Sequence, residues 1–212
     1  MKTIEWKSLI ITSVLCLLPI VLGASVYDVL PNNVAVHWNI NNEPDGYASK
    51  EFFVFMIPFI MMAIQIFNCI IYDINSNRKS ENSKVEKVVK SIIPLINLIL
   101  YVVTILWALG TELDIRKVVC FLVGIIIIII GKYMPEITYE ESKKLQRSLF
   151  LKNEEVWNKV KRKFGCLYIT AGILILTSIL LIPIYSLIAL IIFAVFSIGI
   201  SIYAIVISRK MK

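Results

Sequence analysis

The polar segment Leu30–Lys50 holds the side chains whose types and spacing could do chemistry. It contains His37, the only histidine of the chain, and two carboxylates, Glu43 and Asp45, a few residues further on. A histidine with carboxylates can bind a metal ion or transfer protons. Here the spacing matches no metal-binding pattern, so we favour a packed or hydrogen-bonded histidine over a metal ligand. We therefore predict no catalytic residue, no metal site and no cofactor.

The sequence also lacks the common catalytic motifs. It contains no Gly-x-Ser-x-Gly, no His-Glu-x-x-His and no glycine-rich nucleotide-binding loop. A single histidine further limits acid–base chemistry. We therefore predict that the protein is not an enzyme.

Composition indicates which elements must position this polar segment. The chain has 212 residues, of which 58% are hydrophobic and 17% charged, whereas soluble domains have about 45–50% and about 25%. The apolar residues form runs close to the ~20 residues that a membrane-spanning helix requires. We predict an all-α membrane protein: a six-transmembrane-helix bundle with a short extracellular strand-and-turn loop and an amphipathic cytoplasmic helical loop. The predicted spans are Leu9–Val26, Phe52–Tyr72, Ser91–Gly110, Val118–Met134, Cys166–Pro183 and Tyr185–Ser208.

Two parts of this plan need a further argument. The fourth span is the weakest, because its uncharged stretch runs only from Val118 to Gly131. The last two spans form one apolar block, in which Pro183 is the natural turn between helices. The predicted modules are residues 1–90, with two spans and the extracellular loop 27–51, and residues 91–212, with four spans and the cytoplasmic loop 132–165.

Basic residues orient the predicted bundle. Most of the 22 Lys and Arg residues lie at the termini and in the loops after the second and fourth spans, whereas Lys50, Arg116 and Lys117 lie on the other side. The positive-inside rule then places both termini in the cytoplasm and Leu30–Lys50 outside the cell. The net charge of +7 follows from this topology, so no nucleic acid is needed as a partner. A basic cytoplasmic face also suits anionic membrane lipid.

Ionisable residues are missing from the predicted apolar cores, where the polar exceptions are Gln65, Asn68 and Asn97. We favour interhelical hydrogen bonding for these three, with a substrate path as the alternative. The lack of intramembrane charge argues against a proton- or ion-coupled transporter. The four cysteines show no Cys-x-x-Cys spacing and are expected to be small buried hydrophobic side chains.

The polar segment itself has a strand pattern. Apolar residues alternate with small or polar ones over Val34–Ile40, which predicts a short strand with one apolar face. Turns are predicted at Pro31-Asn32-Asn33 before the strand and at Pro44-Asp45-Gly46 after it. We expect a compact turn–strand–turn cap.

The cytoplasmic loop predicts two helices. Thr138-x-x-Glu141 is a capping box, which should start a helix over Tyr139–Leu151. Asn153 can cap a second helix, whose apolar residues recur at every fourth position from Val156 to Phe164. This basic amphipathic helix would lie on the inner membrane surface as a connector, with a docking platform for a cytoplasmic partner as the alternative.

Three segments together resemble one family of bacterial multi-pass membrane proteins. They are LPNNVAVHWNINNEPDGYASK at Leu30–Lys50, the run Gly131-Lys132-Tyr133-Met134-Pro135, and NEEVWNK at Asn153–Lys159. With the length and the order of the loops, they make the chain similar to the SdpI (sporulation-delay immunity) family, and the resemblance covers nearly the whole sequence.

This resemblance implies a function. SdpI-like proteins protect producer cells from a secreted, membrane-active peptide toxin, and the archetype also recruits a cytoplasmic transcriptional repressor. The chain would be a membrane immunity protein with or without such signalling; the alternative is a transporter or channel for a small solute or peptide. By motif, the toxin-recognition residues would be His37, Trp38, Asn39, Asp45, Tyr47 and Lys50. The cytoplasmic element would be Met134, Pro135, Asn153, Glu154, Trp157 and Asn158.

Overall fold

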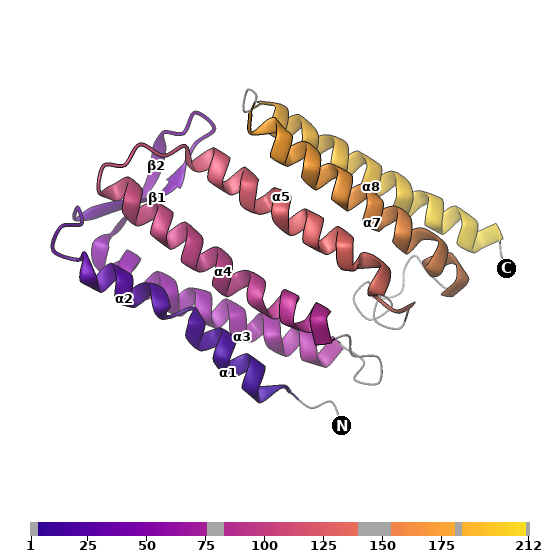
Figure 1. Ribbon diagram of the computed structural model, residues 1–212, viewed down its shortest axis with the longest axis horizontal. Helices are drawn as coiled ribbons and strands as arrows, with labels where there is room; N and C mark the ends of the chain where they lie inside the picture. The colour runs from indigo at the N-terminus through magenta and orange to yellow at the C-terminus, as the bar shows by residue number, and fades with distance from the viewer. Residues whose placement is uncertain (1–3, 76–82, 140–153, 181–183, 211–212) are drawn as a thin grey trace. The chain divides into compact units, whose positions relative to one another are not determined.

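The computed structural model describes residues 4–75, 83–139, 154–180 and 184–210 (Figure 1). The chain divides into two compact units. Unit 1 is Met1–Ile74 with Ser83–Arg116, and unit 2 is Asn75–Asn82 with Lys117–Lys212.

Unit 1 is a helical bundle that carries a β-hairpin. Its elements are α1 (Trp6–Leu15), α2 (Leu18–Ser25), β1 (Asn33–Trp38), β2 (Pro44–Ser49), the π-helical segment η1 (Phe52–Met56), α3 (Ile57–Asn75) and α4 (Ser83–Ala108). Because the hairpin follows α2 and precedes η1 and α3, it lies at one end of the bundle. The start of α1, the end of α3 and the start of α4 meet at the other end (Figure 1).

The β-hairpin confirms the predicted strand and adds a second one. β1 and β2 pair antiparallel, with Val34 opposite Ala48 and Ala35 opposite Tyr47. The register shifts between Ala35 and His37, so the simple alternation predicted for this strand is wrong. Val34 and Ala35 are both buried, whereas Val36 is exposed, as expected where a bulge interrupts the pleat.

The turn predicted at Pro44-Asp45-Gly46 is also wrong, because these residues begin β2. The chain turns earlier, at Asn39–Glu43, where Asn42 has a φ of 64°. The Asn39 side-chain oxygen accepts hydrogen bonds from the backbone N–H groups of Asn41 and Glu43, the local bonding that makes asparagine a turn residue. Gly46 instead permits close strand approach, since a Cβ there would lie 2.9 Å from the Cβ of His37.

Unit 2 consists of long helices and one short helical turn. Its elements are α5 (Ile115–Tyr133), whose first two residues still belong to unit 1, the 3₁₀ segment η3 (Met134–Glu136), α7 (Glu154–Ser178) and α8 (Ile184–Lys210). The fourth span is predicted to be weak because its uncharged stretch runs only from Val118 to Gly131. α5 is longer than this stretch at both ends. Its charged ends are accommodated by local contacts: Arg116 bonds Asp114 at 3.0 Å, and Lys132 lies over the Tyr133 ring.

Glycines bring α5 and α7 into backbone contact. A Cβ on Gly131 would lie 2.8 Å from the Gly165 carbonyl oxygen, and a Cβ on Gly165 would lie 2.9 Å from the Gly131 carbonyl oxygen. The pair Gly124 and Gly172 repeats the arrangement two helical turns away. Small residues that allow such close approach are typical of helix contacts in membranes.

Four helices within the described ranges are long and apolar enough to cross a membrane: Trp6–Ser25, Phe52–Ile74, Val85–Ala108 and Ile115–Glu136. They correspond to the first four predicted spans, so the chain is a helical membrane protein, but six spans are not confirmed. The first turns of α7 carry charged residues, and the apolar helix found within α8 is the shorter Ile191–Tyr203. Pro183 and the helix predicted at Tyr139–Leu151, past its first residue, lie outside the described residues.

Candidate functional site

The β-hairpin is held against the bundle by an apolar cluster. Leu30 and Val34 pack with Phe53 of η1 and with Tyr101 and Ile105 of α4. The rings of Phe53 and Tyr101 stack with centroids 4.5 Å apart. This burial fixes the base of the hairpin, so its outward residues have a stable support.

The turn of the hairpin is bonded to the last segment of unit 1, where α5 begins. The Asn42 side chain donates to the Leu113 carbonyl at 3.2 Å and accepts from the Ile115 N–H at 2.8 Å. Arg116 donates to the Ile40 carbonyl at 2.7 Å. Sequence reasoning did not single out Asn42; the asparagine-rich run before Pro44 was the available signal.

Two of the predicted recognition residues form an exposed pair. The Nδ1 atom of His37 and the Oδ1 atom of Asp45 are 2.5 Å apart, with 73% and 45% of the two side chains exposed. Tyr47 lies further along β2 and is 57% exposed. These three side chains lie on the solvent-facing side of the hairpin and can offer hydrogen bonds and an aromatic surface to a partner.

The other three predicted recognition residues are engaged with the chain itself. Trp38 packs edge-on against Trp107 of α4, with ring centroids 5.6 Å apart. Asn39 shapes the turn, and its amide also donates to Glu43 at 2.9 Å. Lys50 places its ammonium group 4.7 Å from the Tyr27 ring centroid. These contacts position the hairpin, which is compatible with a supporting role.

A second polar pair stands at the base of the hairpin. The Tyr27 hydroxyl donates to the Glu51 carboxylate at 3.0 Å. Local desolvation, helped by this hydrogen bond, raises the pKa of Tyr27 above 10.0. The pKa of Glu51 is lowered below 4.5, first by its own backbone N–H and then by hydrogen bonds from Ser49 and Tyr27.

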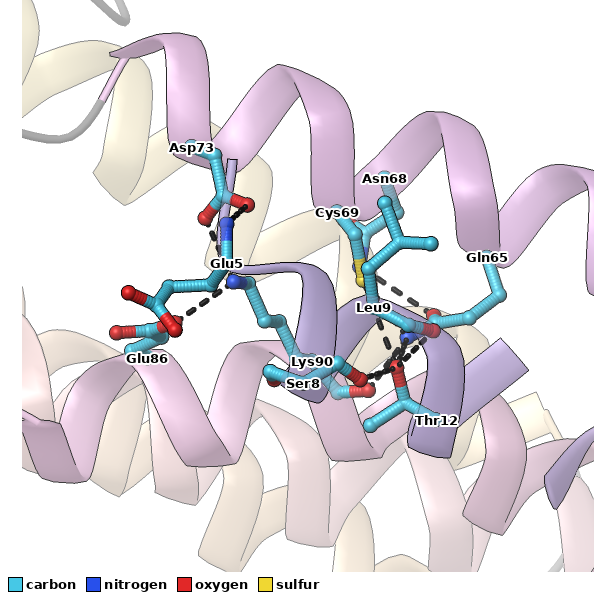
Figure 2. A network of polar contacts seen from close by, with 10 residues as sticks. All are labelled: Glu5, Ser8, Leu9, Thr12, Gln65, Asn68, Cys69, Asp73, Glu86 and Lys90. Atoms are coloured by element: carbon cyan, nitrogen blue, oxygen red, sulfur yellow. Dashed lines mark hydrogen bonds and ion pairs between the residues drawn. The ribbon is translucent and has the colours of Figure 1, made fainter. Parts of the chain in front are cut away.

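A buried ionic network lies at the opposite end of unit 1 (Figure 2). The Lys90 ammonium group is 2.6 Å from Asp73 of α3 and 2.7 Å from Glu86, one turn earlier on α4. The Glu5 N–H, just before α1, donates to the other Asp73 oxygen at 3.0 Å. The Lys90 side chain is 0% exposed, so this network joins the ends of three helices around a buried cation.

Sequence reasoning missed this network. The predicted second and third spans stopped at Tyr72 and began at Ser91, which left Asp73 and Lys90 just outside them. The candidate spans of the structure, Phe52–Ile74 and Val85–Ala108, include both residues. The available signal was the placement of opposite charges at the adjoining ends of two consecutive apolar runs.

Next to this network, Gln65 satisfies a backbone group that a proline leaves free. Pro94 lies inside α4 and has no N–H to donate to the Lys90 carbonyl one turn earlier. The Gln65 side chain of α3 donates to that carbonyl at 2.7 Å and lies 2.8 Å from the Thr12 hydroxyl of α1 (Figure 2). Gln65 thus bonds between helices, as predicted.

Two other backbone irregularities of unit 1 have a similar partner. Where α1 gives way to α2, the Cys16 carbonyl accepts from the Asn97 side chain at 2.9 Å, which confirms the predicted interhelical role of Asn97. In η1, the Val54 carbonyl accepts from the Tyr101 hydroxyl at 3.4 Å. Neighbouring side chains commonly satisfy irregular backbone in this way inside membranes.

The predicted cytoplasmic element is partly buried in unit 2. Trp157 is 2% exposed, and its indole N–H donates to the Ile137 carbonyl at 2.9 Å. Met134 packs on the same cluster, and Pro135 contacts Gly165. The apolar side of this helix is therefore covered by the chain itself and does not face the membrane surface as predicted.

The remaining members of that element are Glu154, Asn158 and Asn153. Glu154 and Asn158 are exposed on the first turns of α7, and Asn153 lies outside the described residues. Lys159 pairs with Glu155 at 2.7 Å on the same surface. The exposed side of α7 is thus polar and available to a partner of unit 2.

No group of three or more His, Cys, Asp and Glu side chains in the described part of the chain could hold a metal ion. Of the four free cysteines, Cys16 and Cys69 are buried, Cys120 is half-buried and Cys166 is exposed. The expectation of buried cysteines therefore holds for two of the four.

Comparison with known proteins gives two findings. Residues 14–62, which include the β-hairpin, match a family described as a domain of unknown function (DUF1648). The chain is 25% identical over 169 residues to "Immunity protein SdpI" of Bacillus subtilis (strain 168), covering 80% of each chain. No solved structure matches. Together these findings support an SdpI-like family.

Proposed function

We propose that this chain is a membrane immunity protein that binds and neutralises a secreted, membrane-active peptide toxin. The observation that carries the proposal is the similarity to an immunity protein over 80% of both chains. The β-hairpin supports it, because a recognition surface needs exposed side chains on a stable support. His37, Asp45 and Tyr47 supply the first, and the cluster around Val34 supplies the second.

In this proposal the β-hairpin faces the outside of the cell and both termini are cytoplasmic. The distribution of Lys and Arg supports that orientation. The toxin would then meet the hairpin before it inserts into the membrane. His37, Asp45 and Tyr47 would contact it directly, while Trp38, Asn39 and Lys50 would hold the hairpin in shape.

The cytoplasmic element would transmit toxin binding to a transcriptional repressor. Its alternative role is purely structural. Glu154 and Asn158 are exposed on α7 and could meet a partner. Met134, Pro135 and Trp157 pack within unit 2, so we assign them a supporting role. Asn153 keeps its proposed place in this element through the sequence resemblance.

The proposal is tested by toxin protection. Cells that are sensitive to secreted bacterial peptides should survive at least tenfold more of the cognate peptide when they express this chain. His37→Ala combined with Tyr47→Ala should remove most of that protection without lowering the amount of protein in the membrane. Asn41→Ala, an exposed change in the same hairpin, is the matched control and should protect as well as the unchanged chain.

Two outcomes would contradict the proposal. One is a lack of protection against a broad panel of secreted peptides, including peptides encoded beside the gene. The other is full protection by the His37→Ala, Tyr47→Ala variant, which would leave immunity possible but remove the β-hairpin as its recognition surface.

One observation favours a transporter as the second candidate. Asp73 and Lys90 are buried within candidate spans, so the argument from missing intramembrane charge no longer holds. Flux of a peptide or small solute into proteoliposomes, lost in Asp73→Asn, would support transport. Toxin protection that persists in Asp73→Asn would favour binding.

A further inference from the structure

Unit 2 carries a basic and aromatic surface beside its polar helix start. Arg162 and Lys163 are exposed on α7, and the Lys163 ammonium group lies 4.4 Å from the ring centroid of Tyr203 on α8. A cation over an aromatic ring is attractive, and the contact orients both side chains. We call these three residues the Lys163 surface.

The Lys163 surface lies at the depth where a membrane span ends. Gly165, on the next half-turn of α7, contacts Gly131 of α5. Lys132 follows Gly131 in the last turn of α5, inside the candidate span Ile115–Glu136. Lys163 and Lys132 are therefore at about the same depth. Paired Lys and Tyr side chains at the end of a span are typical of the headgroup region of a bilayer.

An apolar strip continues from this surface along α8. Gly199 lies one turn before Tyr203, and Val195 one turn before Gly199. Nothing lies within 4 Å of a Cβ built on Gly199, so the space beside it is open. Val195 is 61% exposed. The exposed Val195 side chain and the open space beside Gly199 can together accommodate an acyl chain.

We propose that the Lys163 surface binds the headgroup phosphate of an anionic phospholipid, whose acyl chain lies along Val195 and Gly199. Arg162 and Lys163 supply the charge, and the Tyr203 hydroxyl can donate to a phosphate oxygen. A lipid fits better than a protein or nucleic acid, because Tyr203 sits among exposed apolar residues of α8. Ile202, next to it in sequence, is 55% exposed, and Ile198 on the same helix is 60% exposed.

The test is lipid retention by the purified full-length protein. Native mass spectrometry would count bound phosphatidylglycerol and phosphatidylcholine after equal addition of both to detergent-solubilised protein. We expect phosphatidylglycerol to be retained preferentially. Arg162→Gln with Lys163→Gln should weaken its binding roughly 25-fold, because each basic residue near an anionic surface contributes about fivefold.

Two further variants keep this test decisive. Gly199→Leu fills the open space beside α8 and should reduce retention of both lipids. The preference for phosphatidylglycerol over phosphatidylcholine should stay. Lys117→Gln removes one charge at the opposite end of α5 and should change nothing. Folding of each variant is checked by circular dichroism, and only folded variants are compared.

The proposal is overturned by equal retention of the two lipids, or by equal loss in Lys117→Gln and in the Arg162, Lys163 variant. It is also overturned if inorganic phosphate or glycerol phosphate competes as well as intact phosphatidylglycerol, since the acyl strip would then contribute nothing. Binding of an acidic peptide or of oligonucleotide in preference to phosphatidylglycerol would assign the surface to another class of partner.

Discussion

Units 1 and 2 hold their helices together by different means. In unit 1 the contacts between helices run through buried polar side chains: Gln65, Lys90 and Asn97 bond across helix boundaries. In unit 2, α5 and α7 meet through glycine backbones at Gly131 and Gly165. Hydrogen bonds between side chains and neighbouring helices thus determine the packing of unit 1. The close approach of two helix backbones determines the packing of α5 and α7 in unit 2.

The difference shows what each kind of interface permits. Side-chain hydrogen bonds can satisfy carbonyls that a regular helix would occupy, so unit 1 accommodates Pro94, the α1–α2 break and η1. A glycine contact leaves no room for such partners, so the contact between α5 and α7 relies on small residues at fixed spacing. We expect substitutions to affect the two units in correspondingly different ways.

The largest expected effect is in unit 1. Lys90→Met should destabilise the protein by about 3–5 kcal/mol, because it leaves the buried Asp73 and the partly buried Glu86 without their cation. Unfolding by denaturant in detergent would measure this loss. Lys87→Met, an exposed change on the same helix, should cost less than about 0.5 kcal/mol. Equal effects of the two variants would mean that the buried cation does not organise unit 1.

The next effect is in unit 2. Gly131→Ala should cost about 1–3 kcal/mol, because the added Cβ would lie 2.8 Å from backbone atoms of Gly165 and Ile169 and force the helices apart. The same unfolding measurement applies. Gly199→Ala, where the space is open, should be neutral or stabilise the helix by up to about 1 kcal/mol. A harmless Gly131→Ala would show that contact distance does not hold α5 and α7 together.

A smaller effect tests the link between backbone irregularity and polar side chain. Gln65→Leu should cost about 1 kcal/mol, since the Lys90 carbonyl loses its donor. In a Pro94→Ala background the loss should shrink, because the introduced alanine has a backbone N–H that can donate to that carbonyl. A double-mutant cycle measures this coupling. The same loss in both backgrounds would contradict the proposed compensation.

The smallest effect concerns the base of the β-hairpin. The pKa of Glu51 is depressed, so its contribution is present above pH 4.5 and is lost as the pH falls through its folded pKa. The pKa of Tyr27 is raised, so its contribution is present below pH 10.0 and is lost as the pH rises through its folded pKa. Hydrogen exchange at the Glu51 amide should therefore be slowest between these limits, after correction for intrinsic rates. Tyr27→Phe should remove the rise of the Glu51 exchange rate at alkaline pH. The exchange rates of the unit 2 amides should stay unchanged.

Much of the fold could be predicted from the sequence, because apolar runs of sufficient length identify membrane helices. The first four spans, the strand at Val34 and the bonding roles of Gln65 and Asn97 were recognisable from residue type alone. The turn was misplaced because the Asn39 side-chain oxygen accepts the backbone N–H groups of Asn41 and Glu43 and so closes the turn before Pro44-Asp45-Gly46. Six spans are not confirmed, since charged turns and apolar turns share the single helix α7 and the described residues contain four candidate spans.

The candidate sites were harder to predict, because they depend on contacts between distant parts of the chain. His37 and Asp45 lie within one polar segment, so the sequence could single out both residues, but their pairing comes from the structure. The sequence did not suggest the ionic network, since Asp73 and Lys90 are apart in sequence and each looked like the charged edge of a span. Only the packing of α3 against α4 shows that both charges are buried.

The pairing of Asp73 with Lys90 also bears on how unit 1 enters the bilayer. Each charge alone would oppose the transfer of its end of the helix into the hydrocarbon region. Joined at 2.6 Å, the two largely cancel each other's field. α3 and α4 are therefore expected to leave the insertion machinery as one helical hairpin, so that loss of either charge would raise the amount of chain that fails to integrate.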